Sequence, residues 1–209
     1  MKINEIFYSL QGEGNWTGRP NIFIRTSGCN LRCSYCDTKY AYEDGKEMNA
    51  DEILKQISKY HCKYVCITGG EPLLQDEVLD LIDALSKKDY KICIETNGSL
   101  NIKKISKNKL LLISLDIKCP SSNMHAKNYL KNMSLLRKHD QLKFIIKDRR
   151  DYEYAKKILN IYKPACNVFF QPVWGTDPRR LAEWIVADDL NVRLGLQLHK
   201  MIWGDKQGI

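Results

Sequence analysis

The stretch Cys29-Asn30-Leu31-Arg32-Cys33-Ser34-Tyr35-Cys36 carries most of the information about the fold of this 209-residue chain. Its cysteines have C-x3-C-x2-C spacing, which supplies three thiolates and no neighbouring fourth. A cubane iron–sulfur cluster ordinarily takes one thiolate for each of its four irons. Three thiolates therefore leave one iron open to an outside ligand, such as an amino acid that chelates it through an amine and a carboxylate, and S-adenosylmethionine offers both groups. The sulfonium would then lie beside a reducible cluster, and one electron would release a carbon radical.

A zinc knot is the alternative interpretation of these cysteines. Structural zinc usually takes four Cys or His ligands with paired spacings. The nearest further candidates are His61 and Cys62, which lie 25 and 26 residues beyond Cys36 without such spacing. The pattern therefore favours the cluster over zinc.

Composition indicates one globular domain over residues 1–209, because 44% of the residues are hydrophobic and 28% are charged. The N-terminus Met1–Glu5 has no apolar signal region, which predicts a reduced, cytoplasmic protein with free thiols. Cys62, Cys66 and Cys93 lie in or near apolar runs and are interpreted as buried small hydrophobes. No stretch reaches the ~18 apolar residues of a membrane span. The net charge of +8 is assigned mostly to solvated lysines, so no direct nucleic-acid contact is expected.

Apolar runs alternate with amphipathic stretches along the chain. The predicted strands are 21–26, 64–68, 91–95, 110–117, 141–146 and 168–171, with 192–198 as the candidate for a last strand. The predicted helices are 50–60, 76–87, 126–137, 152–162 and 178–187, with Asp51, Asp76 and Asp177 as N-caps or first-turn acids. This alternation predicts an α/β fold with a mostly parallel sheet. A full eight-fold barrel takes roughly 250 residues, so we expect a partial, open TIM-like βα barrel.

Polar residues follow most of these strands, where parallel α/β folds place their active sites. They are Thr68-Gly69-Gly70-Glu71-Pro72, Glu95-Thr96-Asn97-Gly98, Asp116-Ile117-Lys118, Lys147, Gln171-Pro172 and His199-Lys200. The cysteine stretch follows the first core strand, so it opens at the same rim.

With Tyr35 at the aromatic place, the cysteine stretch resembles the C-x3-C-x-aromatic-C signature of the radical S-adenosylmethionine superfamily. Thr68 to Pro72 resembles its glycine-rich motif. Five further segments closely resemble the 7-carboxy-7-deazaguanine synthase family: Ser9-Leu10-Gln11-Gly12-Glu13-Gly14, Arg25, Cys36-Asp37-Thr38, Asp116-Ile117-Lys118 and Gln171-Pro172.

The resemblance implies conversion of 6-carboxy-5,6,7,8-tetrahydropterin to 7-carboxy-7-deazaguanine with release of ammonia. The implied cofactors are a 4Fe-4S cluster, S-adenosylmethionine and Mg2+. The family also implies a homodimer and an electron donor such as flavodoxin or ferredoxin. Whether the product serves queuosine or archaeosine synthesis is left open.

The resemblance also implies site residues, which fall into four groups. Cys29, Cys33 and Cys36 would hold the cluster, and the hard hydroxyl of Thr38 would bind Mg2+. S-adenosylmethionine would contact Tyr35, Cys36, Asp37, Gly70, Asp116, Ile117, Lys118, Gln171, Pro172, Val173 and Trp174. The substrate would contact a short N-terminal segment, Leu10, Gln11 and Gly12, together with Thr68 and the guanidinium of Arg25, which suits a carboxylate.

Some alternatives stay open at this point. A glycyl-radical enzyme activase shares the cysteine triplet, and a non-catalytic zinc or RNA-binding module would suit the positive charge. Glu13 is either a site residue or a solvated loop acid, and His199 lies over the pocket or packs against the last helix. Some members of the resembled family end with a proline near the substrate, whereas this chain ends in Ile209.

Overall fold

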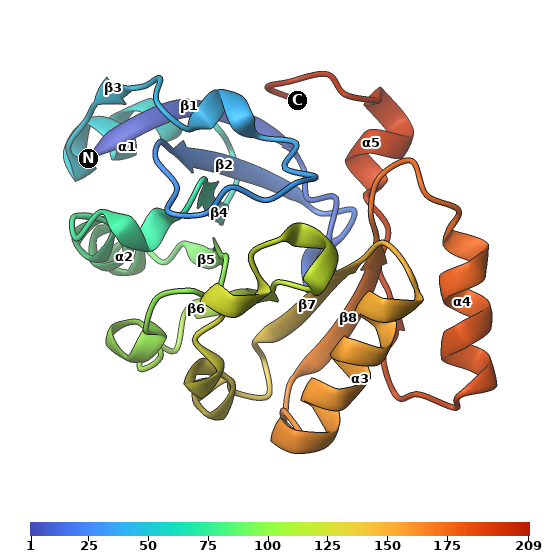
Figure 1. Cartoon of the computed structure of the whole chain (residues 1–209). Coiled ribbons are helices and arrows are strands. Elements are labelled where there is room, and N and C mark those ends of the chain that lie inside the picture. The colour runs from blue at the N-terminus through green and yellow to red at the C-terminus, as the bar shows by residue number, and fades with distance from the viewer.

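A computed structural model describes residues 1–209 and contains one nine-stranded sheet (Figure 1). Its strand order is β3-β1-β2-β4-β5-β6-β7-β8-β9. The strands are β1 (Lys2–Leu10), β2 (Pro20–Thr26), β3 (Lys46–Glu47), β4 (Tyr64–Gly69), β5 (Lys91–Thr96), β6 (Leu111–Ile117), β7 (Gln141–Ile146), β8 (Asn167–Pro172) and β9 (Arg193–Leu194). The helices are α1 (Ala50–Ile57), α2 (Val78–Lys87), α3 (Arg149–Tyr162), α4 (Pro178–Ala187) and α5 (Leu198–Trp203).

The sheet is parallel from β2 through β9, and β1 and β3 extend it with antiparallel pairs. Its two edges, β3 and β9, do not pair with each other. The predicted open βα barrel with a mostly parallel sheet is therefore confirmed. In a parallel sheet the carboxyl ends of the strands meet at one rim, so the segments after β2, β4, β5, β6 and β8 converge there.

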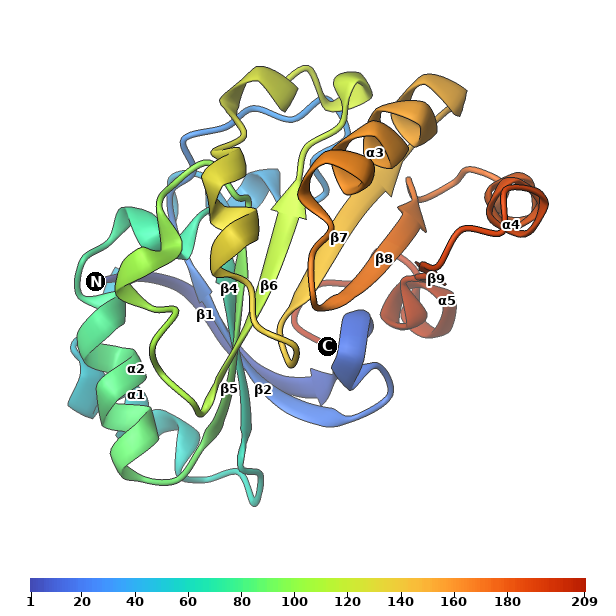
Figure 2. The ribbon, with the colours of Figure 1, turned by 90° about the horizontal axis from the view of Figure 1, so that it is seen from below.

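Helices α1 to α4 cover the outer face of the curved sheet, with α1 beside α2 and α3 over β7 and β8 (Figure 2). Helix α5 lies instead at the cleft. Local sequence explains where they begin. Asn49 and Glu52 form a capping box at α1, and Ile53, Leu54 and Ile57 bury its apolar face. Asp177 caps α4 ahead of Pro178, as its position in the sequence predicts. No helix is both long and apolar enough to cross a bilayer.

The structure corrects the prediction of a helix over residues 126–137. This segment forms two 3-10 turns, His125–Lys127 and Leu130–Leu135. The buried side chain of Asn132 accepts a hydrogen bond from Ile102 N and donates to Leu100 O. These two hydrogen bonds join residues 30 and 32 positions apart, and they tie the irregular segment to the loop after β5.

The ends of the chain also differ from the sequence prediction. The last strand covers only Arg193–Leu194, and the short helix α5 follows it. Strand β1 is absent from the predicted elements, and its register shifts between Ile3 and Glu5 where it pairs with β2. Its side chains show no strict alternation of buried and exposed positions, so the periodic signal of a strand is missing.

Candidate active site

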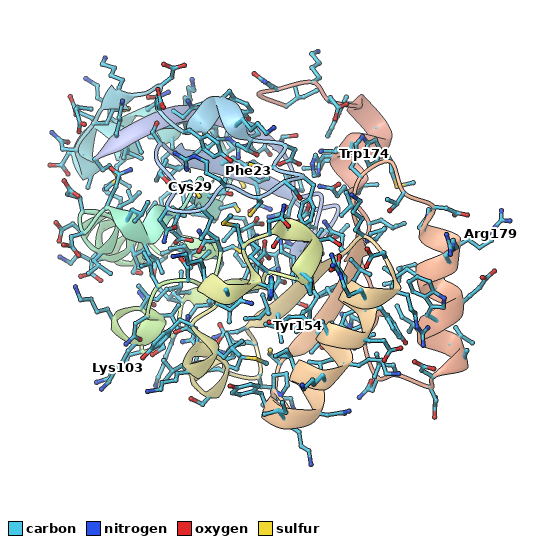
Figure 3. All side chains as sticks on the ribbon, in the orientation of Figure 1. Phe23, Cys29, Lys103, Tyr154, Trp174 and Arg179 are labelled. Carbon is cyan, nitrogen blue, oxygen red and sulfur yellow. The ribbon has the colours of Figure 1, made fainter.

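A cleft of 750 Å³ opens at the carboxyl ends of the parallel strands. Figure 3 shows Cys29 and Trp174 over this rim, whereas Lys103 and Arg179 lie at the periphery. The cleft brings together all but one of the predicted site residues: Leu10, Gln11, Gly12, Arg25, Cys29, Cys33, Tyr35, Cys36, Asp37, Thr38, Thr68, Gly70, Asp116, Lys118, Gln171, Pro172, Val173 and Trp174. Ile117 is the exception, because its side chain is buried in the hydrophobic core. A contact from Ile117 would therefore have to come from its backbone.

The cysteine loop follows β2 and is held against the end of β4. Gly28 has φ +92, a conformation that favours glycine. Glu71 N donates to Gly28 O at 2.9 Å. A Cβ on Gly70 would lie 2.7 Å from Cys29 Cβ and overlap Gly28 O. Glycine at position 70 thus lets the two loops touch.

The carboxylate of Glu71 is fully buried behind this contact. It accepts hydrogen bonds from Leu73 N at 3.0 Å, Thr96 Oγ1 at 2.9 Å and Asn97 N at 2.6 Å. Burial raises its pKa to about 6, although these donors act in the opposite direction. Glu71 therefore ties the loop after β4 to the loop after β5.

Four charged side chains form a network on the floor of the cleft, in which Lys143 is buried and its three carboxylate neighbours are partly buried. Lys143 Nζ lies 2.6 Å from Glu13 Oε2 and 3.5 Å from both Glu95 Oε2 and Asp116 Oδ1. Burial opposes the charge on Glu13, but the nearby Lys143 outweighs burial and lowers the pKa of Glu13. Burial also opposes the charge on Asp116, but Lys118 and Lys143 together lower the pKa of Asp116 below its usual range. The pKa of Glu95 is raised because burial outweighs Lys143.

The network adds Lys143 and Glu95 to the expected site residues. The sequence places Glu95 among the polar residues of the rim without a specific role and assigns none to Lys143. The network also shows which of the two positions left open for Glu13 is correct. Glu13 faces the cleft and accepts from Gln171 Nε2 and Gln197 Nε2, both at 3.0 Å. The sequence predicts that most lysines are solvated, yet the side chain of Lys143, inside the predicted strand 141–146, is 4% exposed. A lysine inside a strand of otherwise buried residues was the available signal.

Arg25 reaches the cleft from β2 with one side of its guanidinium occupied. Its Nε donates to Glu5 Oε1 at 2.7 Å, and the rings of Phe7 and Tyr40 lie 5.8 and 5.7 Å from its guanidinium carbon. No protein group bonds to its two terminal nitrogens. That edge can pair with a carboxylate through two parallel hydrogen bonds.

The end of the chain closes one side of the cleft. Lys200 Nζ lies 2.7 Å from Asp37 Oδ2, and residues 204–209 line the cleft beyond it. His199 lies over Gly12, where a methyl group would overlap its Nδ1. His199 therefore lines the cleft, which decides between the two positions left open for it. Burial lowers its pKa, which favours a neutral imidazole.

Known proteins share this arrangement of loop, sheet and cleft. The model of the Radical SAM superfamily matches residues 23–172. Proteins named 7-carboxy-7-deazaguanine synthase from Thermoplasma acidophilum and Methanospirillum hungatei are 40% and 43% identical to this chain. The alignments cover 100% of both chains in the first case, and 97% of this chain and 85% of the relative in the second. The chain belongs to the 7-carboxy-7-deazaguanine synthase family of radical SAM proteins.

A solved structure of the family has the same fold. The crystal structure of QueE from Escherichia coli superposes with a TM-score of 0.78 at 29% identity, covering 95% of this chain and 94% of that chain. The radical SAM assignment implies a 4Fe-4S cluster and S-adenosylmethionine as cofactors. The donor set of the cleft fits the cluster, because Cys29, Cys33 and Cys36 are free thiols on one loop at its wall.

A second thiol group lies behind the floor of the same cleft. Cys66 and Cys93 are register partners on β4 and β5, and their sulfurs lie within 4.8 Å of each other and of a Glu95 oxygen. Both cysteines are buried, and the hydrogen bond to Cys93 together with burial raises the pKa of Cys66. Their interpretation as buried small hydrophobes is confirmed, whereas Cys62 is only partly buried.

Proposed function

We propose that this protein is a 7-carboxy-7-deazaguanine synthase, which converts 6-carboxy-5,6,7,8-tetrahydropterin to 7-carboxy-7-deazaguanine with release of ammonia. The observation that carries this proposal is the 40% identity to a synthase over 100% of both chains. The cleft supports it, because it joins the cysteine loop to the N-terminal residues Leu10, Gln11 and Gly12. The second candidate from the sequence is a glycyl-radical enzyme activase. The relatives from Thermoplasma and Methanospirillum are both named as synthases and not as activases.

Cys29, Cys33 and Cys36 would hold the cluster, which together with S-adenosylmethionine supplies a carbon radical when bound. Two buried polar atoms of residues that line the cleft have no hydrogen-bond partner, and they support binding of the polar cofactor beside it. They are Tyr35 Oη and Gln171 Oε1. Asp116, which is paired with Lys118 and Lys143, is a further proposed contact. The other contacts proposed for S-adenosylmethionine are Cys36, Asp37, Gly70, Ile117, Lys118, Pro172, Val173 and Trp174.

The substrate would lie between Arg25 and the N-terminal segment. The free edge of Arg25 would pair with the pterin carboxylate. Leu10, Gln11, Gly12 and Thr68 line this part of the cleft and are proposed to contact the ring edge. His199 fills the space that a side chain at position 12 would need. The surrounding walls would exclude water from the reacting ring.

Thr38 would bind Mg2+ in this arrangement. Thr38 lines the cleft, and its Oγ1 donates to Asp37 Oδ1 at 2.8 Å. A hydroxyl beside a carboxylate offers the hard oxygen donors that Mg2+ prefers, and Mg2+ ordinarily keeps few protein ligands. The proposed role of Mg2+ is to hold the substrate.

An anaerobic assay tests the proposed function. Cluster-reconstituted protein is incubated with S-adenosylmethionine, a reductant, Mg2+ and 6-carboxytetrahydropterin, and the products are read by mass spectrometry. A product lighter than the substrate by one ammonia, with S-adenosylmethionine not consumed in proportion, is expected. Cleavage to 5′-deoxyadenosine without that product would overturn the substrate assignment and favour the activase.

The physiological electron donor and the oligomeric state stay predictions. A flavodoxin or ferredoxin is proposed as the donor, and a homodimer as the assembly. Replacing dithionite with each purified donor in the same assay tests the first, and light scattering of the anaerobic protein tests the second.

A further inference from the structure

Asn97 follows β5 and directs its side-chain amide at the cysteine loop. It is 7% exposed. Its Nδ2 donates to Cys29 Sγ at 3.8 Å and to Asn30 Oδ1 at 3.0 Å. Its Oδ1 accepts from Ser99 N at 3.0 Å and from Ser99 Oγ at 2.6 Å. Because a backbone N–H can only donate, Ser99 fixes which end of the amide faces the sulfur.

The amide is held from two further sides. The backbone N–H of Asn97 donates to the buried Glu71 carboxylate at 2.6 Å. Asn30 Nδ2 donates to Ser99 Oγ at 2.8 Å, which closes a ring of hydrogen bonds through Asn97, Asn30 and Ser99. This support leaves the amide little freedom to turn away from Cys29.

Cys29 is the cysteine of the triplet that receives a side-chain amide. The backbone of Leu31 also donates to Cys29 Sγ, at 3.4 Å, and a substitution of Asn97 would leave that bond in place. Hydrogen bonds to cluster sulfurs are among the factors that set the reduction potential of iron–sulfur clusters. They stabilise the reduced form more, because its sulfurs carry more negative charge.

We propose that Asn97 is a positioning residue that raises the reduction potential of the cluster through an N–H···S hydrogen bond to Cys29. The inference rests on the proposed role of Cys29 as a cluster ligand. Without the amide, the reduction potential of the cluster would be lower, and a smaller fraction of clusters would be reduced at a given potential of the electron donor. The supply of electrons to S-adenosylmethionine would then slow without a change in the substrate-binding residues.

The test is an anaerobic redox titration of the cluster-loaded protein, followed by electron paramagnetic resonance in the absence of S-adenosylmethionine. Asn97→Leu removes the donor at similar size. At the wild-type midpoint it is expected to show about a tenfold lower ratio of reduced to oxidised cluster, which is about 59 mV for one electron. Asn97→Asp keeps the acceptor for Ser99 and turns a negative oxygen toward Cys29, so its shift should have the same sign and be at least as large.

Asn132→Leu is the matched control. The Asn132 amide donates to Gly98 O at 3.3 Å and to Leu100 O at 2.7 Å, so its loss loosens the same loop without removing a bond to sulfur. The midpoint of this variant should equal that of the wild-type protein, although its melting temperature should fall.

Several results would overturn the inference. Equal midpoints in wild-type, Asn97→Leu and Asn97→Asp proteins would do so while leaving the proposed function intact. The same holds for an equal shift in Asn132→Leu, or for failure of both Asn97 variants to load iron and sulfide when Asn132→Leu loads them. If Cys29→Ala assembles the cluster as well as the wild type does, the ligand assignment and this inference fall together.

Discussion

Lys200 Nζ lies 2.7 Å from Asp37 Oδ2, so a residue of the last helix is paired with the residue that follows the cysteine loop. Lys200 is 8% exposed, and its hydrogen bond and charge outweigh burial and lower the pKa of Asp37. The pair holds α5 over the cleft.

Replacing Lys200 with Met should loosen α5. Because the Asp37 side chain is 49% exposed, the expected loss of unfolding free energy is only about 1 kcal/mol. Urea unfolding of the metal-free chain measures it. Lys55→Met, on the exposed face of α1, serves as the control, and equal stability of the two variants would contradict the assigned role of the pair.

Gly12→Ala should be destabilising because the new methyl group overlaps His199. Overpacking of this kind costs about 1–3 kcal/mol. The variant His199→Ala removes the side chain that the new methyl group would overlap. In that background, Gly12→Ala should therefore cost much less unfolding free energy than it costs in the wild-type protein. A double-mutant cycle by urea unfolding checks this, and strict additivity of the two substitutions would show that the contact does not matter.

Lys143→Met should destabilise the protein more than Lys200→Met or Gly12→Ala. It leaves Glu13, Glu95 and Asp116 without their shared buried cation, and breaking a buried ion pair typically costs about 3–5 kcal/mol. Lys147→Met, in the exposed loop after the same strand, should have little effect. The Lys143 and Lys147 variants are compared by thermal and urea unfolding at pH 7.

The stability difference between the wild-type protein and Lys143→Met should also depend on pH, and the direction of that dependence follows from the pKa shifts. Lys143 lowers the pKa of Glu13 and Asp116 in the fold, so the stability it provides is present above their unfolded pKa values and is lost as pH falls. The difference between wild type and Lys143→Met should therefore shrink toward pH 4. A difference that grows on acidification would contradict the network.

Glu71 should give a pH effect of the opposite sign. Its pKa in the fold is about 6 against an ordinary 4.5, so the folded state binds the extra proton between these values. Wild-type stability should then fall by about 2 kcal/mol relative to Glu71→Gln as pH rises through this window, since one pKa unit corresponds to about 1.36 kcal/mol. Urea unfolding at intervals from pH 4.5 to 7 measures the difference, and a constant difference would exclude the raised pKa.

Thr38→Ala should lower kcat/KM for the pterin by about tenfold or more if Thr38 binds Mg2+. Thr38→Ser keeps the hydroxyl and should retain most of the rate. Steady-state rates over a Mg2+ series check both variants, and higher Mg2+ should partly restore Thr38→Ala. Equal Mg2+ dependence in all three proteins would remove Thr38 from the proposed metal site.

Local patterns in the sequence predicted the parallel strands, four of the five expected helices and the rim on which the polar residues gather. They succeeded because each strand or helix buries one periodic face, and because the cysteine spacing is contiguous. The buried network could not be predicted in the same way. Glu13, Glu95 and Lys143 are 48 to 130 residues apart in the sequence, and only the sheet order brings their side chains together.

The C-terminal wall of the cleft was also hard to predict. Val192 to Leu198 has strand-like composition, but the edge strand is only two residues long and α5 begins at Leu198. The contact of His199 with Gly12 depends on a glycine whose role is to leave space. A sequence pattern shows which side chains are present, but it does not show that position 12 must lack a side chain to make room for His199.

The cleft is walled by both ends of the chain, from Leu10 to Glu13 and from Gln197 to Ile209. During synthesis the N-terminal part of a domain can begin to fold while the rest is still being made. The cysteine loop is therefore made early, but Asp37 can pair with Lys200 only after the residues between them have been made. A product that stalls before Lys200 would carry the three cysteines without the wall that encloses them, so the enclosure of the cleft depends on residues made long after the cysteine loop.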